Sequence, residues 1–130
     1  MKTCLITGAS GGIATALATS LRHDGWRLAL VSRDAGKVAS IGDDQIIEAD
    51  VATEAGAADA IAKASEHFGA VPDAVVNATG AILIAPITRT SEAQYRACLA
   101  ANLDTAFFTS KAYVSALQKE KRAGSLLLFS

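Results

Sequence analysis

The chain has 130 residues, which is long enough for one domain and too short for two ordinary ones. Its formal net charge is −1 and its basic residues form no stripe, which argues against nucleic acid or an anionic membrane surface as the main partner. The apolar runs are too short to span a bilayer, and the first residues, MKTCLITG, contain no signal-peptide core. Two isolated cysteines without a histidine cluster do not indicate a metal site. We therefore expect a cytoplasmic protein.

Apolar segments of strand and helix type alternate along the chain. In chain order we expect a strand over 2–7, a helix over 12–24, a strand over 27–32, a short helix over 35–40, a strand over 45–49, a helix over 53–68, a strand over 73–77, a helix over 91–122 broken near 100–102, and a strand over 125–129. Continuous apolar strands separated by helices are typical of a parallel sheet covered on both faces. The predicted fold class is α/β, as a single doubly wound domain over residues 1–130.

A glycine-rich turn, TGASGGIA, covers residues 7–14 between the first strand and the first helix. Unpaired N–H groups and the dipole at a helix start favour an anion. Gly8 suits a tight turn, Gly12 lets the backbone approach a pyrophosphate, and Ser10 offers a hydroxyl donor. The alternative is a packing turn without a ligand. The position of the turn, directly after the first strand, favours dinucleotide binding.

Six segments in the same order resemble the short-chain dehydrogenase/reductase family. TGASGGIA resembles its TGxxxGxG loop, with Ala14 in place of the third glycine. The others are VSRD (31–34), ADV (49–51), NATG (77–80), ANLDTAFFTSKA (101–112) and GSLLLFS (124–130). The resemblance implies a Rossmann-like sheet, of which these residues cover the first five strands. It also implies an oxidoreductase that transfers hydride between a nicotinamide dinucleotide and a carbonyl or alcohol substrate.

The resemblance implies a set of cofactor-binding residues: Gly8, Ser10, Gly11, Gly12, Ile13, Ser32, Arg33, Asp50, Val51, Asn77, Ala78 and Gly80. NAD-binding members of the family usually carry an acidic residue where Ser32 stands. Arg33 can instead form charge-assisted bonds to a 2′-phosphate, so we expect NADP, with NAD as the alternative. The other interpretation makes Arg33 a solvated surface residue that Asp34 partly neutralises.

Two further segments are expected to contact the adenosine half of the cofactor. Asp50 is expected to accept a hydrogen bond from the adenine amino group, beside Val51; alternatively, Asp50 caps the helix that follows. Asn77, Ala78 and Gly80 would pass under the adenosine ribose. At positions 78 and 79 the chain has Ala-Thr where the family has Asn-Ala.

The resemblance implies only one residue of the catalytic machinery in this sequence. Asn102 matches the family's helix asparagine, which supports a water in the proton relay. The family also needs a tyrosine followed four positions later by a lysine, but Tyr95 and Tyr113 are each followed there by leucine. Ser130 matches the residue just before the catalytic serine. We therefore expect residues 1–130 to be inactive alone.

Three interpretations remain open at this point. We favour the first, in which the chain is the N-terminal part of an NADP-dependent oxidoreductase. In this interpretation a C-terminal half completes a small-molecule substrate site. The alternatives are a half-length dinucleotide-binding module and a scaffold that has lost its ligand.

The last strand suggests self-association. The segment SLLLF (125–129) is apolar and has no charge or proline, so an unpaired edge there would recruit another strand. We also expect the helix over 102–121 to leave four large side chains partly exposed: Phe107, Phe108, Tyr113 and Leu117. The sequence therefore predicts a homo-oligomer, with a frayed, disordered C-terminus over 126–129 as the alternative.

Overall fold

The computed structural model of the chain describes residues 1–129, and Ser130, with the serine match noted above, lies outside them. The strands are β1 (Thr3–Thr7), β2 (Arg27–Ser32), β3 (Gln45–Glu48), β4 (Ala74–Asn77) and β5 (Ser125–Leu128). The helices are α1 (Gly12–His23), α2 (Glu54–Phe68), α3 (Glu92–Leu99) and α4 (Thr105–Glu120). Shorter elements are the 3₁₀ turns η1 (Ala35–Lys37) and η2 (Ile87–Arg89) and the π-helical segment η3 (Ala100–Asp104).

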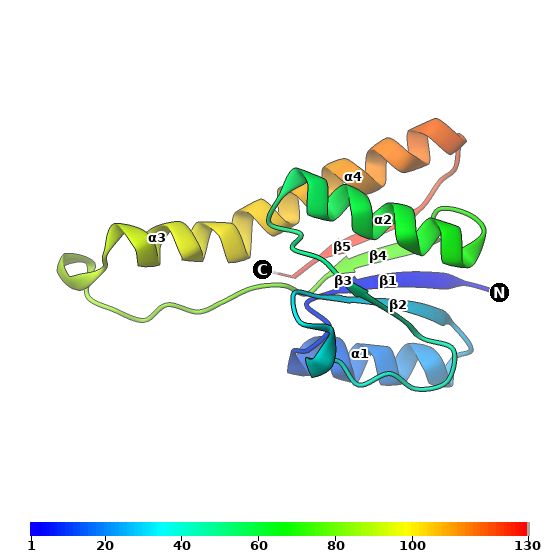
Figure 1. Cartoon of the computed structure of the whole chain (residues 1–130), viewed down its shortest axis with the longest axis horizontal. Helices are drawn as coiled ribbons and strands as arrows, with labels where there is room; N and C mark the ends of the chain where they lie inside the picture. The colour runs from blue at the N-terminus through cyan, green and yellow to red at the C-terminus, as the bar shows by residue number, and fades with distance from the viewer. Residues whose placement is uncertain (130) are drawn as a thin grey trace.

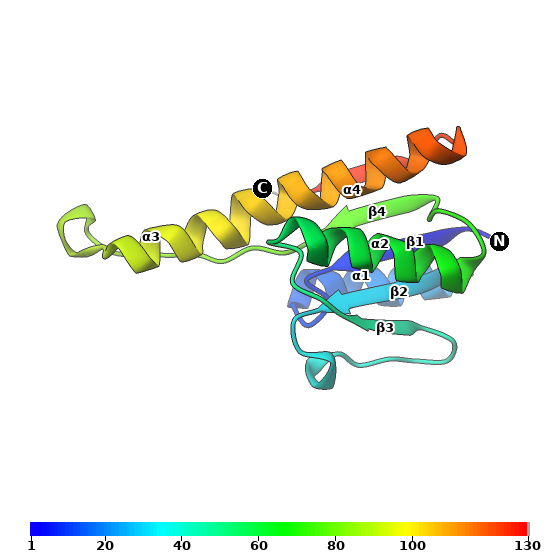
Figure 2. The same ribbon diagram turned by 45° about the horizontal axis from the view of Figure 1, so that its top comes forward.

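The five strands form one parallel sheet in the order β3-β2-β1-β4-β5. Helix α1 covers one face, while α2 and α4 cover the other (Figures 1 and 2). The chain winds outward from β1 through β2 to β3, then crosses over and continues with β4 and β5. The expected α/β fold with a doubly wound parallel sheet is therefore confirmed.

Alternate residues of the strands supply the two halves of the core. In β1, Leu5 packs with the cluster under α2 and α4, whereas Cys4 and Ile6 pack with the cluster under α1. This alternation follows from the two-residue period of a strand, and it buries both faces of β1. Burial raises the pKa of the Cys4 thiol to about 12, so this cysteine stays protonated as part of the core.

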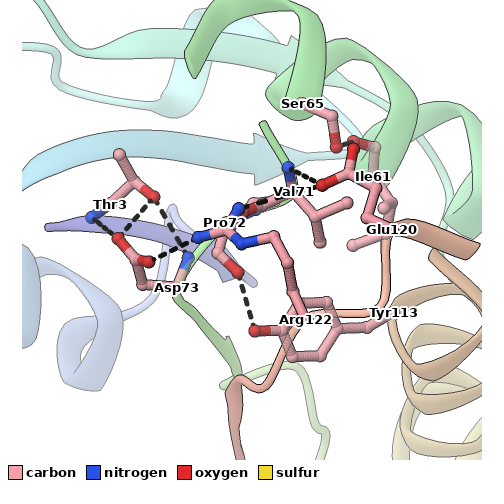
Figure 3. A network of polar contacts seen from close by, with 9 residues as sticks. All are labelled: Thr3, Ile61, Ser65, Val71, Pro72, Asp73, Tyr113, Glu120 and Arg122. Atoms are coloured by element: carbon pink, nitrogen blue, oxygen red, sulfur yellow. Dashed lines mark hydrogen bonds and ion pairs between the residues drawn. The ribbon is translucent and has the colours of Figure 1, made fainter. Parts of the chain in front are cut away.

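A network of polar contacts fastens the amino ends of the strands (Figure 3). The Asp73 carboxylate accepts hydrogen bonds from the backbone N–H of Thr3 (2.9 Å), the Thr3 hydroxyl (3.1 Å) and Arg122 Nη2 (2.9 Å). Arg122 Nη1 donates to the carbonyl oxygen of Val71 (2.6 Å). We call Thr3, Asp73, Tyr113 and Arg122 the amino-end clasp. It connects β1, the loop before β4 and the turn between α4 and β5.

Tyr113 corrects one expectation from the sequence. Its side chain is fully buried rather than partly exposed, and its hydroxyl donates to the carbonyl oxygen of Pro72 (2.7 Å). A Cβ added to Gly124 would lie 2.2 Å from the Tyr113 hydroxyl oxygen, so only glycine lets the chain pass over the ring. Phe108 and Leu117 are partly buried and Phe107 is exposed, as expected.

The long α-helix is interrupted at residues 100–104, close to the expected break near 100–102, but the interruption is a π-helical segment and the chain stays helical through it. Helix α3 continues through η3 into α4 with right-handed helical backbone angles at both joins. The Asn102 side chain donates to the carbonyl oxygen of Cys98 (2.9 Å) and so takes a partner that a backbone N–H would use in a regular α-helix. The turn widens to a π-helix instead of ending.

The helix expected over 35–40 is shorter in the structure, where it is a single 3₁₀ turn. Asp34 caps this turn by accepting from Gly36 N, and the chain then becomes extended at Val38. All four residues of β5 are exposed, unlike those of β1. No helix within residues 1–129 is long and apolar enough to cross a membrane.

Candidate functional site

The carboxyl ends of β1 and β4 mark the point where the chain changes its winding direction. Loops leaving these two strands diverge, which opens a crevice in sheets of this type. A hollow of about 340 Å³ lies there, and we call it the switch-point hollow. It is lined by Gly8, Ser10, Gly11, Val31, Ser32, Arg33, Ala49, Asp50, Val51, Ala52, Ala78, Thr79, Gly80, Ala81, Ala97, Ala100, Ala101 and Thr105.

The glycine-rich turn forms one wall of the hollow. Gly8 has φ +66°, and a Cβ there would lie 2.8 Å from the backbone oxygen of Ala78. Gly11 N donates to the carbonyl oxygen of Gly8 (3.0 Å), which closes the turn. Helix α1 then begins at Gly12 without a side-chain cap, unlike α2 and α3. Its first-turn N–H groups are therefore available to an anion.

The loop after β2 leaves one cation at the hollow. Ser32 is buried, and its hydroxyl accepts from the backbone N–H of Asp34 (3.2 Å). The Asp34 carboxylate accepts from Gly36 N (3.0 Å) and so caps η1, and no ion pair within residues 1–129 joins it to Arg33. The Arg33 side chain is exposed and makes no hydrogen bond or ion pair with any residue of 1–129. The guanidinium is therefore free to bind a ligand anion.

The loop after β3 contributes a carboxylate. Ala49 N donates to the carbonyl oxygen of Ser32 (3.0 Å), which holds this loop beside the end of β2. Asp50 Oδ1 accepts from Ala52 N (3.0 Å), and the residue is exposed at the hollow. Thr53, not Asp50, caps α2, because its hydroxyl accepts from Gly56 N. The capping role considered for Asp50 is therefore wrong.

The loop after β4 passes between the glycine turn and α4. Ala78 and Gly80 line the hollow, but Asn77 does not. Its side chain is 1% exposed and turns into the protein, where Oδ1 accepts from the Thr7 hydroxyl (2.5 Å). The Asn77 side chain therefore does not reach the hollow, although the next residue in the chain, Ala78, lines it.

Gly12, Ile13 and Asn102 also lie outside the lining of the hollow. Gly12 and Ile13 form the first turn of α1, and the Ile13 side chain is 57% exposed. The Asn102 amide braces Ala81: Oδ1 accepts from its N–H (3.1 Å) and Nδ2 donates to its carbonyl oxygen (2.9 Å). The binding or catalytic roles of these three residues stay predictions.

Helical residues that we did not anticipate complete the far wall. Ala97, Ala101 and Thr105 line the hollow at intervals of four residues, and Ala100 lies beside them. This spacing puts small side chains on one helix face. A search of the segment before and after Asn102 for small residues at helical spacing would have found them.

A larger hollow of about 540 Å³ lies between α2 and α4. Its walls are mostly apolar, with Ile61, Phe108 and Ala116 among them, and Glu54 pairs with Lys111 at one end. Its lining within residues 1–129 includes no glycine turn and no uncapped helix start. Of the two hollows, the switch-point hollow is the one that lies beside the glycine turn before the uncapped start of α1.

Comparisons with known proteins identify the family of the chain. The family model for short chain dehydrogenase matches residues 2–130. An uncharacterized oxidoreductase of Staphylococcus aureus (strain MRSA252) is 26% identical over 132 residues, covering 97% of this chain and 56% of that protein. One from Staphylococcus epidermidis (strain ATCC 35984) is 28% identical over 124 residues, with coverages of 92% and 54%. The chain thus spans about half the length of these curated relatives.

Solved structures show the same fold. A Brucella melitensis protein described as a short-chain dehydrogenase/reductase and glucose/ribitol dehydrogenase is 29% identical, with a TM-score of 0.80, covering 88% of this chain and 51% of that one. A Leptospira borgpetersenii short chain dehydrogenase with bound NAD⁺ is 22% identical, with a TM-score of 0.89 and coverages of 99% and 51%. Since the family model matches nearly every residue, the chain belongs to the short-chain dehydrogenase family.

Proposed function

We propose that this chain is the dinucleotide-binding part of an NAD(P)-dependent oxidoreductase and that it favours NADP(H). One observation carries the preference: Arg33 stands at the switch-point hollow without an internal partner among residues 1–129, and the preceding position is the neutral Ser32. A carboxylate at that position would accept from a ribose 2′-hydroxyl, whereas a free guanidinium binds a 2′-phosphate.

The residues around the hollow fit the parts of such a cofactor. The uncapped start of α1 and the glycine turn would hold the pyrophosphate, with Ser10 as a further donor. Asp50, whose Oδ1 bonds to Ala52 N, keeps its other carboxylate oxygen to accept from the adenine amino group. When bound, the nicotinamide supplies or accepts a hydride at a carbonyl or alcohol carbon.

Neither tyrosine of the chain is at the hollow to act as a general acid. Tyr113 belongs to the amino-end clasp, and Tyr95 lies on α3, half exposed and outside the lining. We therefore assign dinucleotide binding, not turnover, to residues 1–129. The substrate of the whole protein is a small molecule bound when a C-terminal half, like that of the longer relatives, completes the site.

The test is titration of the purified chain with NADPH and NADH, followed by cofactor fluorescence. We expect tighter binding of NADPH, and Arg33→Ala should remove about 10- to 100-fold of that preference, as expected for a charge-assisted contact. Arg89→Ala is the matched control, because Arg89 is exposed on η2 and does not line the hollow. Equal affinities of the unmutated chain for the two cofactors would contradict the preference, and no binding of either would contradict the function.

The expected homo-oligomer and cytoplasmic location also remain proposals. Leu127 on β5 is 51% exposed, Phe129 just after β5 is 44% exposed, and Phe107 on α4 is 59% exposed. Apolar side chains with such exposure on a sheet edge and an adjacent helix favour contact with a second copy. We therefore propose association through β5 or α4.

A further inference from the structure

A buried chain of hydrogen bonds runs beneath the switch-point hollow from the loop after β4 to the start of α4. The Thr79 hydroxyl donates to Thr7 Oγ1 (3.0 Å), and the Thr7 hydroxyl donates to Asn77 Oδ1 (2.5 Å). Asn77 Nδ2 donates to Thr105 Oγ1 (3.5 Å), and the Thr105 hydroxyl donates to the carbonyl oxygen of Ala101 (2.8 Å). We call Thr79, Thr7, Asn77 and Thr105 the buried polar chain.

The donor and the acceptor of each hydrogen bond in the buried polar chain are fixed. Asn77 Oδ1 is a carbonyl oxygen and can only accept, so the single proton of the Thr7 hydroxyl is committed to it. Thr7 can then only accept from Thr79, which commits the Thr79 proton as well. The Thr79 oxygen therefore keeps lone pairs alone for any further partner.

Thr79 is also the member of the chain that a ligand can reach. It lines the switch-point hollow and is partly exposed, whereas Thr7 and Asn77 are 0% and 1% exposed and do not line it. Thr105 lines the hollow but is 2% exposed, and its proton is committed to α4. A ligand group at Thr79 must therefore donate a hydrogen bond.

We propose that Thr79 is a cofactor-binding residue whose Oγ1 accepts from the 3′-hydroxyl of the adenosine ribose, with Thr7 and Asn77 as positioning residues. The inference rests on the proposed function. In NADP(H) the 2′-oxygen carries the phosphate assigned to Arg33, so the 3′-hydroxyl is the donor that remains on that ribose. Thr79 offers the complementary acceptor, beside the backbone of Ala78 and Gly80 at the same wall.

The experiment compares NADPH with its analogue lacking the adenosine 3′-hydroxyl. The wild-type chain should bind the analogue about fivefold more weakly, as expected for one lost hydrogen bond. Thr79→Val keeps the shape of the side chain but removes the acceptor, so it should bind both ligands equally. Thr79→Ser should restore the discrimination. Thr90→Val is the control, because that hydroxyl bonds to Pro86 O and its residue lies outside the hollow.

The ratio of the two affinities separates ligand contact from a purely structural role, because loss of internal order would weaken both ligands alike. Equal binding of the two ligands by the wild-type chain would overturn the inference, whether or not the variants fold. The same discrimination in Thr79→Val as in wild type would also overturn it. Both results leave the proposed function standing, whereas failure of the wild-type chain to bind either NADPH or NADH would overturn the function and the inference together.

Discussion

The two ends of the sheet differ in how their polar groups are paired. At the amino end, Asp73 receives three hydrogen bonds from Thr3 and Arg122, and the Tyr113 hydroxyl is paired as well. At the carboxyl end, Arg33 has no partner among the described residues, and α1 begins without a side-chain cap. Both ends are built from loops that join the same parallel strands, so topology alone does not produce this difference.

We infer from this contrast that the polar groups at the amino end stabilise the fold and that those at the carboxyl end bind the ligand. Polar groups that satisfy one another at the amino end hold strands together and leave little for a ligand. Exposed groups without a protein partner at the carboxyl end, Arg33 and the first turn of α1, supply the interactions that a phosphorylated ligand needs. Substitutions at the amino end should therefore change folding without changing affinity. At the carboxyl end, they should change affinity, and folding only where the backbone is constrained.

The largest effect is expected from Gly8→Ala, where both kinds of change occur. A Cβ at Gly8 would meet the backbone oxygen of Ala78 at 2.8 Å, and φ is +66°. We expect a loss of about 2–4 kcal/mol in the free energy of unfolding, together with loss of NADPH binding. Gly25→Ala is the matched control, because φ is +81° but no atom lies within 4 Å of the added Cβ.

The control should lose about 1 kcal/mol and bind NADPH normally, since only backbone strain is added. Urea unfolding and cofactor fluorescence measure the two quantities. Equal destabilisation in both glycine variants would contradict the close approach of the turn to the loop after β4.

A smaller effect is expected from Asp73→Asn in the amino-end clasp. The backbone N–H of Thr3, with further help from Arg122, lowers the pKa of Asp73 below its usual value of 3.8. A carboxyl whose pKa is lowered by folding stabilises the protein above its unfolded-state pKa and loses this effect as the pH falls through the folded-state value. The variant should lose about 1 kcal/mol near neutral pH, since the site is partly exposed.

The difference between wild type and Asp73→Asn should shrink below a pH of about 4, while NADPH affinity stays unchanged throughout. Asp59→Asn is the control, because within residues 1–129 the Asp59 carboxylate forms only an exposed pair with Lys63 on one helix. A stability difference between wild type and Asp73→Asn that does not depend on pH would contradict the role of the Asp73 carboxylate. A change in NADPH affinity would contradict the assignment of the amino end to stability alone.

A change in assembly rather than in folding is expected from Leu127→Lys. Leu127 is half exposed on β5, where a charge opposes pairing with another strand. Light scattering at micromolar concentration should show the wild-type chain as an oligomer and the variant shifted towards monomer. A monodisperse monomer for both, with β5 ordered, would exclude association through this strand.

The smallest expected signal is turnover. Residues 1–130 should not oxidise NADPH measurably with a panel of ketones, because no tyrosine followed four residues later by lysine is present to supply a proton. Steady oxidation at a rate proportional to the protein concentration would contradict the assignment of binding without turnover.

Local sequence signals were sufficient for most of the fold. Val, Ile and Leu runs placed all five strands within one residue at each end, and Thr53 and Gly25 marked a helix start and a helix end correctly. These features depend on short-range chemistry: a hydroxyl cap for α2, and a left-handed glycine directly after the C-cap residue of α1. The glycine turn located one wall of the switch-point hollow for the same reason.

Long-range contacts account for what the sequence did not reveal. The widened turn at Asn102 arises because its amide bonds to Cys98 and to Ala81, which are separated in the sequence. Tyr113 is buried because the chain returns over it at Gly124. Likewise, the hydrogen bond between Thr79 and Thr7 joins residues that are far apart in the sequence, so residue spacing could not predict it.

Amide hydrogen exchange of the chain with and without NADPH tests the contrast between the two ends most directly. We predict slower exchange on NADPH binding in four segments, 8–14, 32–34, 50–52 and 78–81, which surround the switch-point hollow. Segments 71–73 and 122–125 around the amino-end clasp should be unchanged. Slower exchange in the clasp, or along the α2–α4 hollow near Ile61 and Phe108 instead of at the glycine turn, would contradict the account.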